Sequence, residues 1–145
     1  MKRKEARKEV SKLLYLLFSL TLFLSCEEKS GDYNEYEQNI IDNLCLDEWV
    51  RFYDFEGDVY CEKYLFKKDG RCSRTFIIYD KSGNEKDKTT NQYYWSFNDP
   101  GFKSFYLDSN YLFEIKSLTK SRLYVDVSLL NDPFNEKEYQ EYTHN

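Results

Sequence analysis

Apolar and polar residues alternate in the second half of the chain. One extended segment carries apolar side chains at every second position, namely Tyr111, Phe113 and Ile115. The next segment repeats the pattern with Leu123, Val125, Val127 and Leu129. Because successive side chains of a strand point to opposite faces, this period of two predicts strands with one buried face.

Five further runs combine aromatic or β-branched residues with charges, as half-buried strands do. With the two segments above, the predicted strands are residues 46–55, 62–68, 71–80, 91–97, 103–108, 110–118 and 121–130. Turn-forming residues separate them: Glu56-Gly57, Asp69-Gly70, Ser82-Gly83-Asn84, Asn98-Asp99-Pro100-Gly101, Ser109-Asn110 and Thr119-Lys120. Such short connections favour hairpins. The sequence therefore predicts an antiparallel up-and-down meander.

Residues 132–143 fit two structures. Asp132 as an N-cap with Pro133 at the first helical position would begin a short helix. A polar eighth strand would instead cover the exposed edge of the sheet. The strand is favoured, because eight antiparallel strands suffice for a small closed barrel. The predicted fold class is all-β, with seven to eight strands in a small barrel.

The N-terminal region has the features of an export signal. Residues 1–12 hold six Lys/Arg and two Glu, and the apolar run 13–24 is too short to cross the roughly 30 Å core of a bilayer. Residues 1–25 are therefore predicted to be a signal peptide. The "FLSC" boundary resembles the lipobox of bacterial lipoproteins, which implies lipid attachment at Cys26 and anchoring in a membrane.

An acidic, polar stretch follows Cys26 and has no apolar periodicity. Residues 26–39 are predicted to be a disordered tether, and residues 40–145 a single domain. Glu27 and Glu28 directly after Cys26 resemble the export signal that sends Bacteroidota lipoproteins to the outer face of the outer membrane.

Several motifs of the domain resemble the small lipocalin-like lipoproteins of Bacteroidota. They are the leading "LCLDEW", the Phe66–Gly70 hairpin, "YYWSF" around Trp95, and the closing hairpin from Ile115 to Leu123. The G-x-W signature of true lipocalins reads Asp47-Glu48-Trp49 here. The resemblance implies a barrel with Trp49 at its closed end and an outer-membrane location.

Charge excludes one class of partner. The chain has 21 Lys/Arg and 26 Asp/Glu, and removing residues 1–25 leaves 15 and 24, a formal charge of −9. Binding to nucleic acid depends on cationic side chains that replace counterions, so nucleic acid is not an expected partner.

No catalytic or metal-binding constellation is predicted. The single histidine, His144, lies next to the C-terminus, where a solvated tail is expected. With one histidine, neither a tri-histidine zinc site nor a Ser-His-Asp triad can form. The sequence predicts no cofactor and no enzymatic activity.

Three cysteines remain after Cys26, and an oxidising compartment favours one disulfide. If Asp69-Gly70 is a two-residue turn, paired positions sum to 139, so Cys61 and Cys72 are not direct neighbours. A Cys45–Cys61 bond is favoured, because an antiparallel first hairpin brings both toward one end. Cys61–Cys72 and three free thiols are the alternatives.

Large aromatic side chains are predicted to fill the barrel: Trp49, Phe66, Trp95 and Phe97. If a cavity exists, the candidates to line it are Trp95, Phe97, Phe113, Ser73 and Thr75.

Two functions are compatible with the predicted barrel. The first is binding of a small apolar or amphipathic ligand in the barrel. The second is a protein-interaction module at the cell envelope, such as an inhibitor, an immunity protein or an assembly factor.

Overall fold

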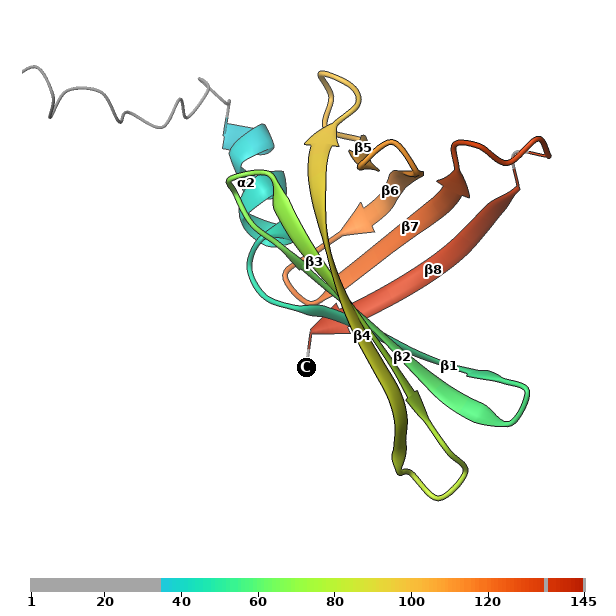
Figure 1. Cartoon of the computed structure of the whole chain (residues 1–145). Helices are drawn as coiled ribbons and strands as arrows, with labels where there is room; N and C mark the ends of the chain where they lie inside the picture. Colours follow the sequence, from blue (N-terminus) through green and yellow to red (C-terminus); the bar gives the residue numbers. More distant parts are fainter. Residues whose placement is uncertain (1–34, 135, 145) are drawn as a thin grey trace, which may run out of the picture. The chain divides into compact units, whose positions relative to one another are not determined.

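The structure is a computed structural model that describes residues 35–134 and 136–144. Within them, one helix precedes eight strands: α2 (Glu35–Leu44), β1 (Trp49–Phe55), β2 (Asp58–Phe66), β3 (Arg71–Tyr79), β4 (Glu85–Phe97), β5 (Ser104–Leu107), β6 (Tyr111–Leu118), β7 (Arg122–Leu129) and β8 (Lys137–His144). The strands are antiparallel and close into a barrel in sequence order (Figure 1). The predicted all-β barrel is confirmed, and the ambiguous tail forms β8.

Two short seams close the barrel. β1 pairs with β8 only through Trp49↔His144 and Val50↔Thr143, and β4 pairs with β5 through three residue pairs centred on Ser96. The remaining neighbours pair over four or more residues. Both seams lie at the same end, here called the closed end. From it β1–β4 and β5–β8 diverge toward an open end, as the crossing ribbons in Figure 1 show.

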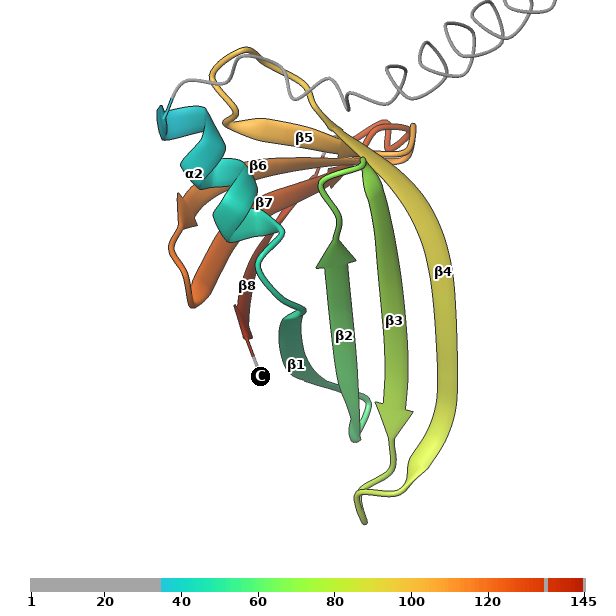
Figure 2. The same cartoon turned by 90° about the vertical axis from the view of Figure 1, so that its left-hand side faces the viewer.

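Aromatic side chains and α2 fill the closed end. Trp49, Phe66, Trp95, Phe105 and Phe113 are all buried there, and Phe97 packs against them half-buried, which confirms the predicted core-filling role of Trp49, Phe66, Trp95 and Phe97. The indole N–H of Trp49 donates to the carbonyl of Leu44 at the end of α2, at 2.8 Å. The indole of Trp95 donates to the carbonyl of Lys67, at 2.9 Å. Figure 2 shows α2 beside β6 at this end.

The helix occupies, in its first half, residues that were predicted to be tether. Its buried side chains, Ile41 and Leu44, belong to one face of the helix, and Gln38 donates to Asp42 one turn on. Residues 35–39 are therefore helical, and the polar composition that predicted disorder reflects the exposed faces of α2. The signal peptide, Cys26 and the rest of the tether lie outside the described residues.

Two strands begin earlier than predicted. Glu56 and Gly57 both have positive φ, which makes a tight two-residue turn, so β2 begins directly at Asp58 rather than at residue 62. β4 begins at Glu85 rather than at residue 91, and residues 85–92 are all exposed. Because these residues bury neither face, they lack the alternation by which strands are recognised.

The turn between β2 and β3 is longer than predicted. Lys67 N–H donates to the carbonyl of Arg71, and Gly70, with a φ of 85°, donates to the carbonyl of Lys67. Phe66 therefore pairs with Cys72, and paired positions sum to 138 instead of 139.

Among the described residues, no helix has the length and apolar character that a membrane span requires.

Candidate functional site

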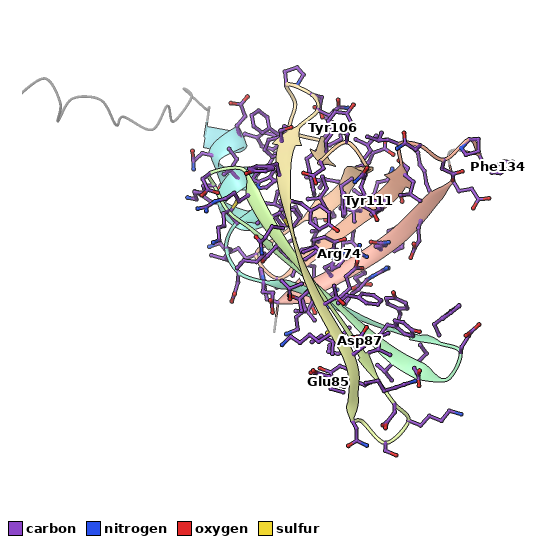
Figure 3. The ribbon with its side chains drawn as sticks, viewed as in Figure 1. Arg74, Glu85, Asp87, Tyr106, Tyr111 and Phe134 are labelled. Carbon is purple, nitrogen blue, oxygen red and sulfur yellow. The ribbon has the colours of Figure 1, made fainter. Side chains whose placement is uncertain are left out.

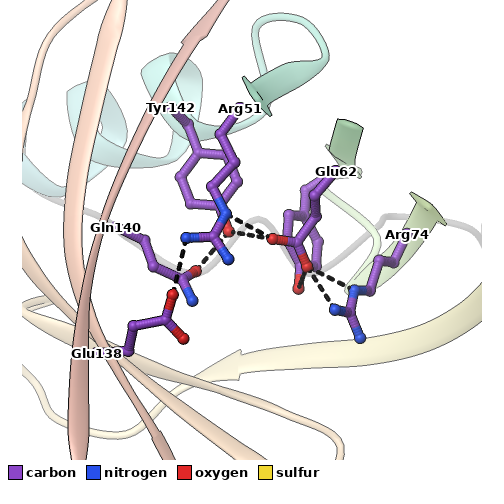
Figure 4. A network of polar contacts seen from close by, with 7 residues as sticks. Arg51, Glu62, Arg74, Glu138, Gln140 and Tyr142 are labelled. Atoms are coloured by element: carbon purple, nitrogen blue, oxygen red, sulfur yellow. Dashed lines mark hydrogen bonds and ion pairs between the residues drawn. The ribbon is translucent and has the colours of Figure 1, made fainter. Parts of the chain in front are cut away.

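A buried carboxylate lies between two arginines midway along the barrel. Glu62 on β2 is 2% exposed. Its Oε2 accepts from Arg51 Nε at 2.8 Å, and its Oε1 accepts from Arg74 Nε at 2.7 Å and lies 2.5 Å from Arg74 Nη2. Figure 4 shows this Arg51–Glu62–Arg74 triad. A carboxylate held by two guanidinium groups is one of the few arrangements in which a buried charge is tolerated.

Two tyrosines complete the bonding of Glu62. The hydroxyls of Tyr64 and Tyr142 each lie 3.0 Å from one of its oxygens. The Tyr142 hydroxyl is also 2.6 Å from the side-chain amide of the buried Gln140. The structure places Oε1 of Gln140 toward this hydroxyl. Because a hydroxyl has one proton, it donates to Glu62 when the Gln140 amide is turned so that its nitrogen donates to Tyr142. The triad is thereby tied to β8 across the β1–β8 seam.

Strand register brings the triad together. Arg51 is paired directly with Glu62 on β2, and both face inward because they are two residues from the paired Trp49 and Tyr64. Arg74 is paired with Tyr64, so it lies diagonally opposite Glu62 on the same face. The tight Glu56-Gly57 turn fixes the first of these registers.

Electrostatics keep Glu62 ionised. Burial by itself raises the pKa of this carboxyl, but the charges of Arg74 and Arg51 and the two tyrosine hydrogen bonds outweigh it, so the pKa lies below its ordinary value. Burial and the charge of Glu62 also raise the pKa of Tyr64 and of Tyr142. The tyrosines therefore remain donors to the carboxylate.

The triad forms one wall of a cleft of about 520 Å³ that begins where the half-sheets diverge. From β1–β3 the lining residues are Arg51, Tyr53, Glu62, Tyr64 and Arg74. From the opposite half they are Tyr111, Val127, Leu129, Lys137 and Gln140, with Asp132, Glu136 and Glu138 at the rim. Figure 3 shows Arg74 and Tyr111 facing the space between the two halves. This volume lies within the roughly 300–1,000 Å³ of small-molecule sites.

The predicted lining residues lie elsewhere. Trp95, Phe97 and Phe113 belong to the aromatic core of the closed end. Ser73 and Thr75 pair with residues whose side chains alternate to the outer face, namely Leu65 and Lys63. None of these five lines the cleft, because large rings fill the closed end and leave space only toward the open end.

The described cysteines are free thiols. Cys72 belongs to the inner core, whereas Cys61 packs with Val50 and Ile77 in a separate cluster on the outer face. The structure therefore brings together neither Cys45 with Cys61 nor Cys61 with Cys72. Burial raises the pKa of Cys45 and of Cys72 to about 12, which keeps both thiols protonated near neutral pH.

The C-terminal histidine is part of the barrel and not of a solvated tail. His144 is half-buried in β8, and its ring lies 3.9 Å from that of Trp49, centroid to centroid. Its Nδ1 lies 3.1 Å from the carbonyl of Glu48, an acceptor, so this nitrogen carries a proton. The prediction of a frayed end was wrong, because β8 must reach residue 144 to meet β1.

Sequence reasoning missed Arg51, Glu62, Arg74 and the tyrosines. One signal was present: a two-residue turn at Glu56-Gly57 pairs Arg51 with Glu62 on the face of Trp49. Comparisons of the chain with protein-family models, with curated proteins and with solved structures find no match.

Proposed function

We propose that this protein is a lipid-anchored binding protein of the cell envelope whose cleft takes up a small amphipathic molecule. The observation that carries the proposal is the cleft itself. Its lining combines the Arg51–Glu62–Arg74 triad with tyrosine rings and aliphatic side chains. A ligand with one polar and one apolar part fits this lining better than a wholly apolar ligand, because buried polar groups require partners.

The rigidity of the triad supports a binding role. Glu62 accepts from four different side chains, so the guanidinium groups and tyrosine hydroxyls are fixed in place without a ligand. A site that is ordered before binding loses less conformational entropy when the ligand arrives.

Binding is tested with N-phenyl-1-naphthylamine, an uncharged aromatic fluorophore, added to the full chain in mild detergent. We expect saturable binding, and a Leu129→Asp variant should bind about tenfold more weakly, because a charge replaces apolar surface that lines the cleft. Leu130→Asp is the matched control, since Leu130 is exposed next to Leu129 and does not line the cleft. Equal titrations for both variants would contradict the proposed site, and detergent contributes equally to both.

The lipid anchor at Cys26 is proposed from the sequence. We also propose that it holds the protein in the outer membrane, with the domain displayed at the cell surface. Cys26→Ser should abolish incorporation of labelled palmitate and release the protein from sedimented membranes. Cys45→Ser is the control and should keep both the label and the sedimentation. A labelled, sedimenting Cys26→Ser protein would show that the lipid is attached elsewhere or that another segment holds the protein.

The second candidate, a protein-interaction module, is favoured by apolar side chains exposed toward the open end. They are Phe55, Leu129, Leu130 and Phe134, the last labelled at the tip of the β7–β8 connection in Figure 3. A folded protein that binds no fluorophore would favour this function over ligand binding.

A further inference from the structure

We propose that the cleft selects ligands with a single negative charge on an aromatic or apolar body, and that Arg74 binds the anionic group. The inference rests on the proposed function and names the ligand class of the same site. It rests on Arg74, which uses two of its guanidinium nitrogens to bind Glu62 and leaves the third free to bind a ligand.

Arg74 retains donors that face the cleft. Its Nε and Nη2 both contact Oε1 of Glu62, whereas Nη1 donates to none of the residues that the structure describes. Figure 4 shows this third nitrogen pointing away from Glu62. The side chain is 24% exposed and lines the cleft. A guanidinium group with one edge held and another free is suited to bind a carboxylate, sulfonate or phosphate oxygen.

Three rings frame the same guanidinium. Its Cζ lies 5.7 Å from the ring of Tyr64, 5.8 Å from that of Phe76 and 5.9 Å from that of Tyr111. These rings come from β2, β3 and β6, so they surround Arg74 from both halves of the barrel. An anion at Nη1 would place its attached apolar body beside Tyr64 and Tyr111, the two of these rings that line the cleft.

The uncompensated positive charge lies on the Arg74 side. Glu62 carries one negative charge between two arginines and already accepts from four side chains. Arg51 has a second carboxylate partner, because its Nη1 lies 3.1 Å from Glu138. Arg74 has no second ion pair among the described residues. An added anion is therefore attracted to Arg74 rather than to Arg51.

The opposite rim limits the charge of the ligand. Asp132, Glu136 and Glu138 border the cleft, and Asp132 is fixed by accepting the N–H groups of Phe134 and Glu136. Lys137, also in the lining, is paired with Glu114. Of the lining side chains three are cationic and four acidic, so the cleft as a whole repels a polyanion. A monoanion can direct its charge to Arg74 and keep an uncharged body near the rim.

The test compares two probes that share one body. 1-Anilinonaphthalene-8-sulfonate differs from N-phenyl-1-naphthylamine by its sulfonate, so the ratio of their dissociation constants isolates the anionic group. With the full chain under matched detergent conditions, we expect the sulfonate to bind about tenfold more tightly, as a charge-assisted hydrogen bond provides. Arg74→Gln should weaken binding of the sulfonate about tenfold more than it weakens binding of the uncharged probe, which removes the preference for the sulfonate.

Two further variants separate recognition from stability and from general charge. Arg74→Lys keeps a positive charge for Glu62 but lacks the free guanidinium nitrogen. It should therefore also lose most of the preference for the sulfonate. It serves if Arg74→Gln does not fold. Arg122→Gln removes an exposed arginine outside the cleft and should change the dissociation constant of neither probe. Binding of the uncharged probe shows in each case that the cleft is intact.

The two proposals fail differently. If neither probe binds the wild type saturably, the proposed function is overturned, and the ligand class with it. If the uncharged probe binds and separates Leu129→Asp from Leu130→Asp, the proposed function stands. In that case, equal affinity for the two probes, or an Arg74→Gln variant that keeps the sulfonate preference, overturns the inference.

Discussion

Glu62→Ala is expected to lower the free energy of unfolding by about 3–5 kcal/mol, because removal of one member of a buried ionic group leaves the others uncompensated. Two guanidinium groups would face each other across the vacated space, and two tyrosine hydroxyls would lose their acceptor. The matched control is Glu138→Ala. Glu138 also pairs with Arg51 but is 67% exposed, so its loss should cost at most about 1 kcal/mol.

The acid dependence of stability gives a second readout of the same residue. The folded-state pKa of Glu62 is depressed, so its ionised form stabilises the fold above the unfolded-state pKa. That stabilisation is lost as the pH falls through the folded-state pKa. Glu62→Gln should therefore be less stable than wild type at neutral pH, and the difference should shrink toward acid. Urea unfolding at a series of pH values measures both effects, and a constant difference would show that Glu62 is not ionised in the fold.

Trp49→Ala should destabilise the protein by a similar amount, about 3–5 kcal/mol. The indole is fully buried, contacts the ring of His144 and donates to the carbonyl of Leu44. Truncation therefore leaves a cavity beside the β1–β8 seam and an acceptor without its donor. Such a loss is a large share of the 5–15 kcal/mol typical of a domain.

Tyr94→Ala is the control for Trp49→Ala. Tyr94 is a large aromatic residue that is 72% exposed on β4, so its truncation should change stability by about 0.5 kcal/mol or less. Both variants are compared by urea unfolding monitored by far-UV circular dichroism. A Trp49→Ala cost no larger than that of Tyr94→Ala would mean that the closed end tolerates the cavity or repacks around it.

The sequence was informative where a strand buries one face and a turn has its own chemistry. Residues 110–118 and 121–130 alternate, and β6 and β7 lie within one residue of those limits at each end. It was uninformative where both faces meet water. The first eight residues of β4 are exposed, so nothing in their pattern distinguishes a strand from a loop.

The candidate site was harder to predict, because it depends on register. Arg51, Glu62 and Arg74 are individually ordinary in a chain that is 32% charged. Placing Arg74 diagonally opposite Glu62 requires the length of the Lys67–Gly70 turn, and a two-residue turn at Asp69-Gly70 shifts every β2–β3 pair by one. The inward direction of charged side chains also contradicts the usual expectation that charge faces solvent.

The β1–β8 seam has a consequence for the order of folding. Every other strand pairs with its neighbour in sequence, so most of the sheet forms through local contacts with small loops to close. The seam joins Trp49 and Val50 to Thr143 and His144, almost the full length of the domain away, and contributes only two residue pairs. Its loop-closure entropy is the largest in the fold, while its immediate gain is small. The meander is therefore expected to form first, and the seam to join its two ends last.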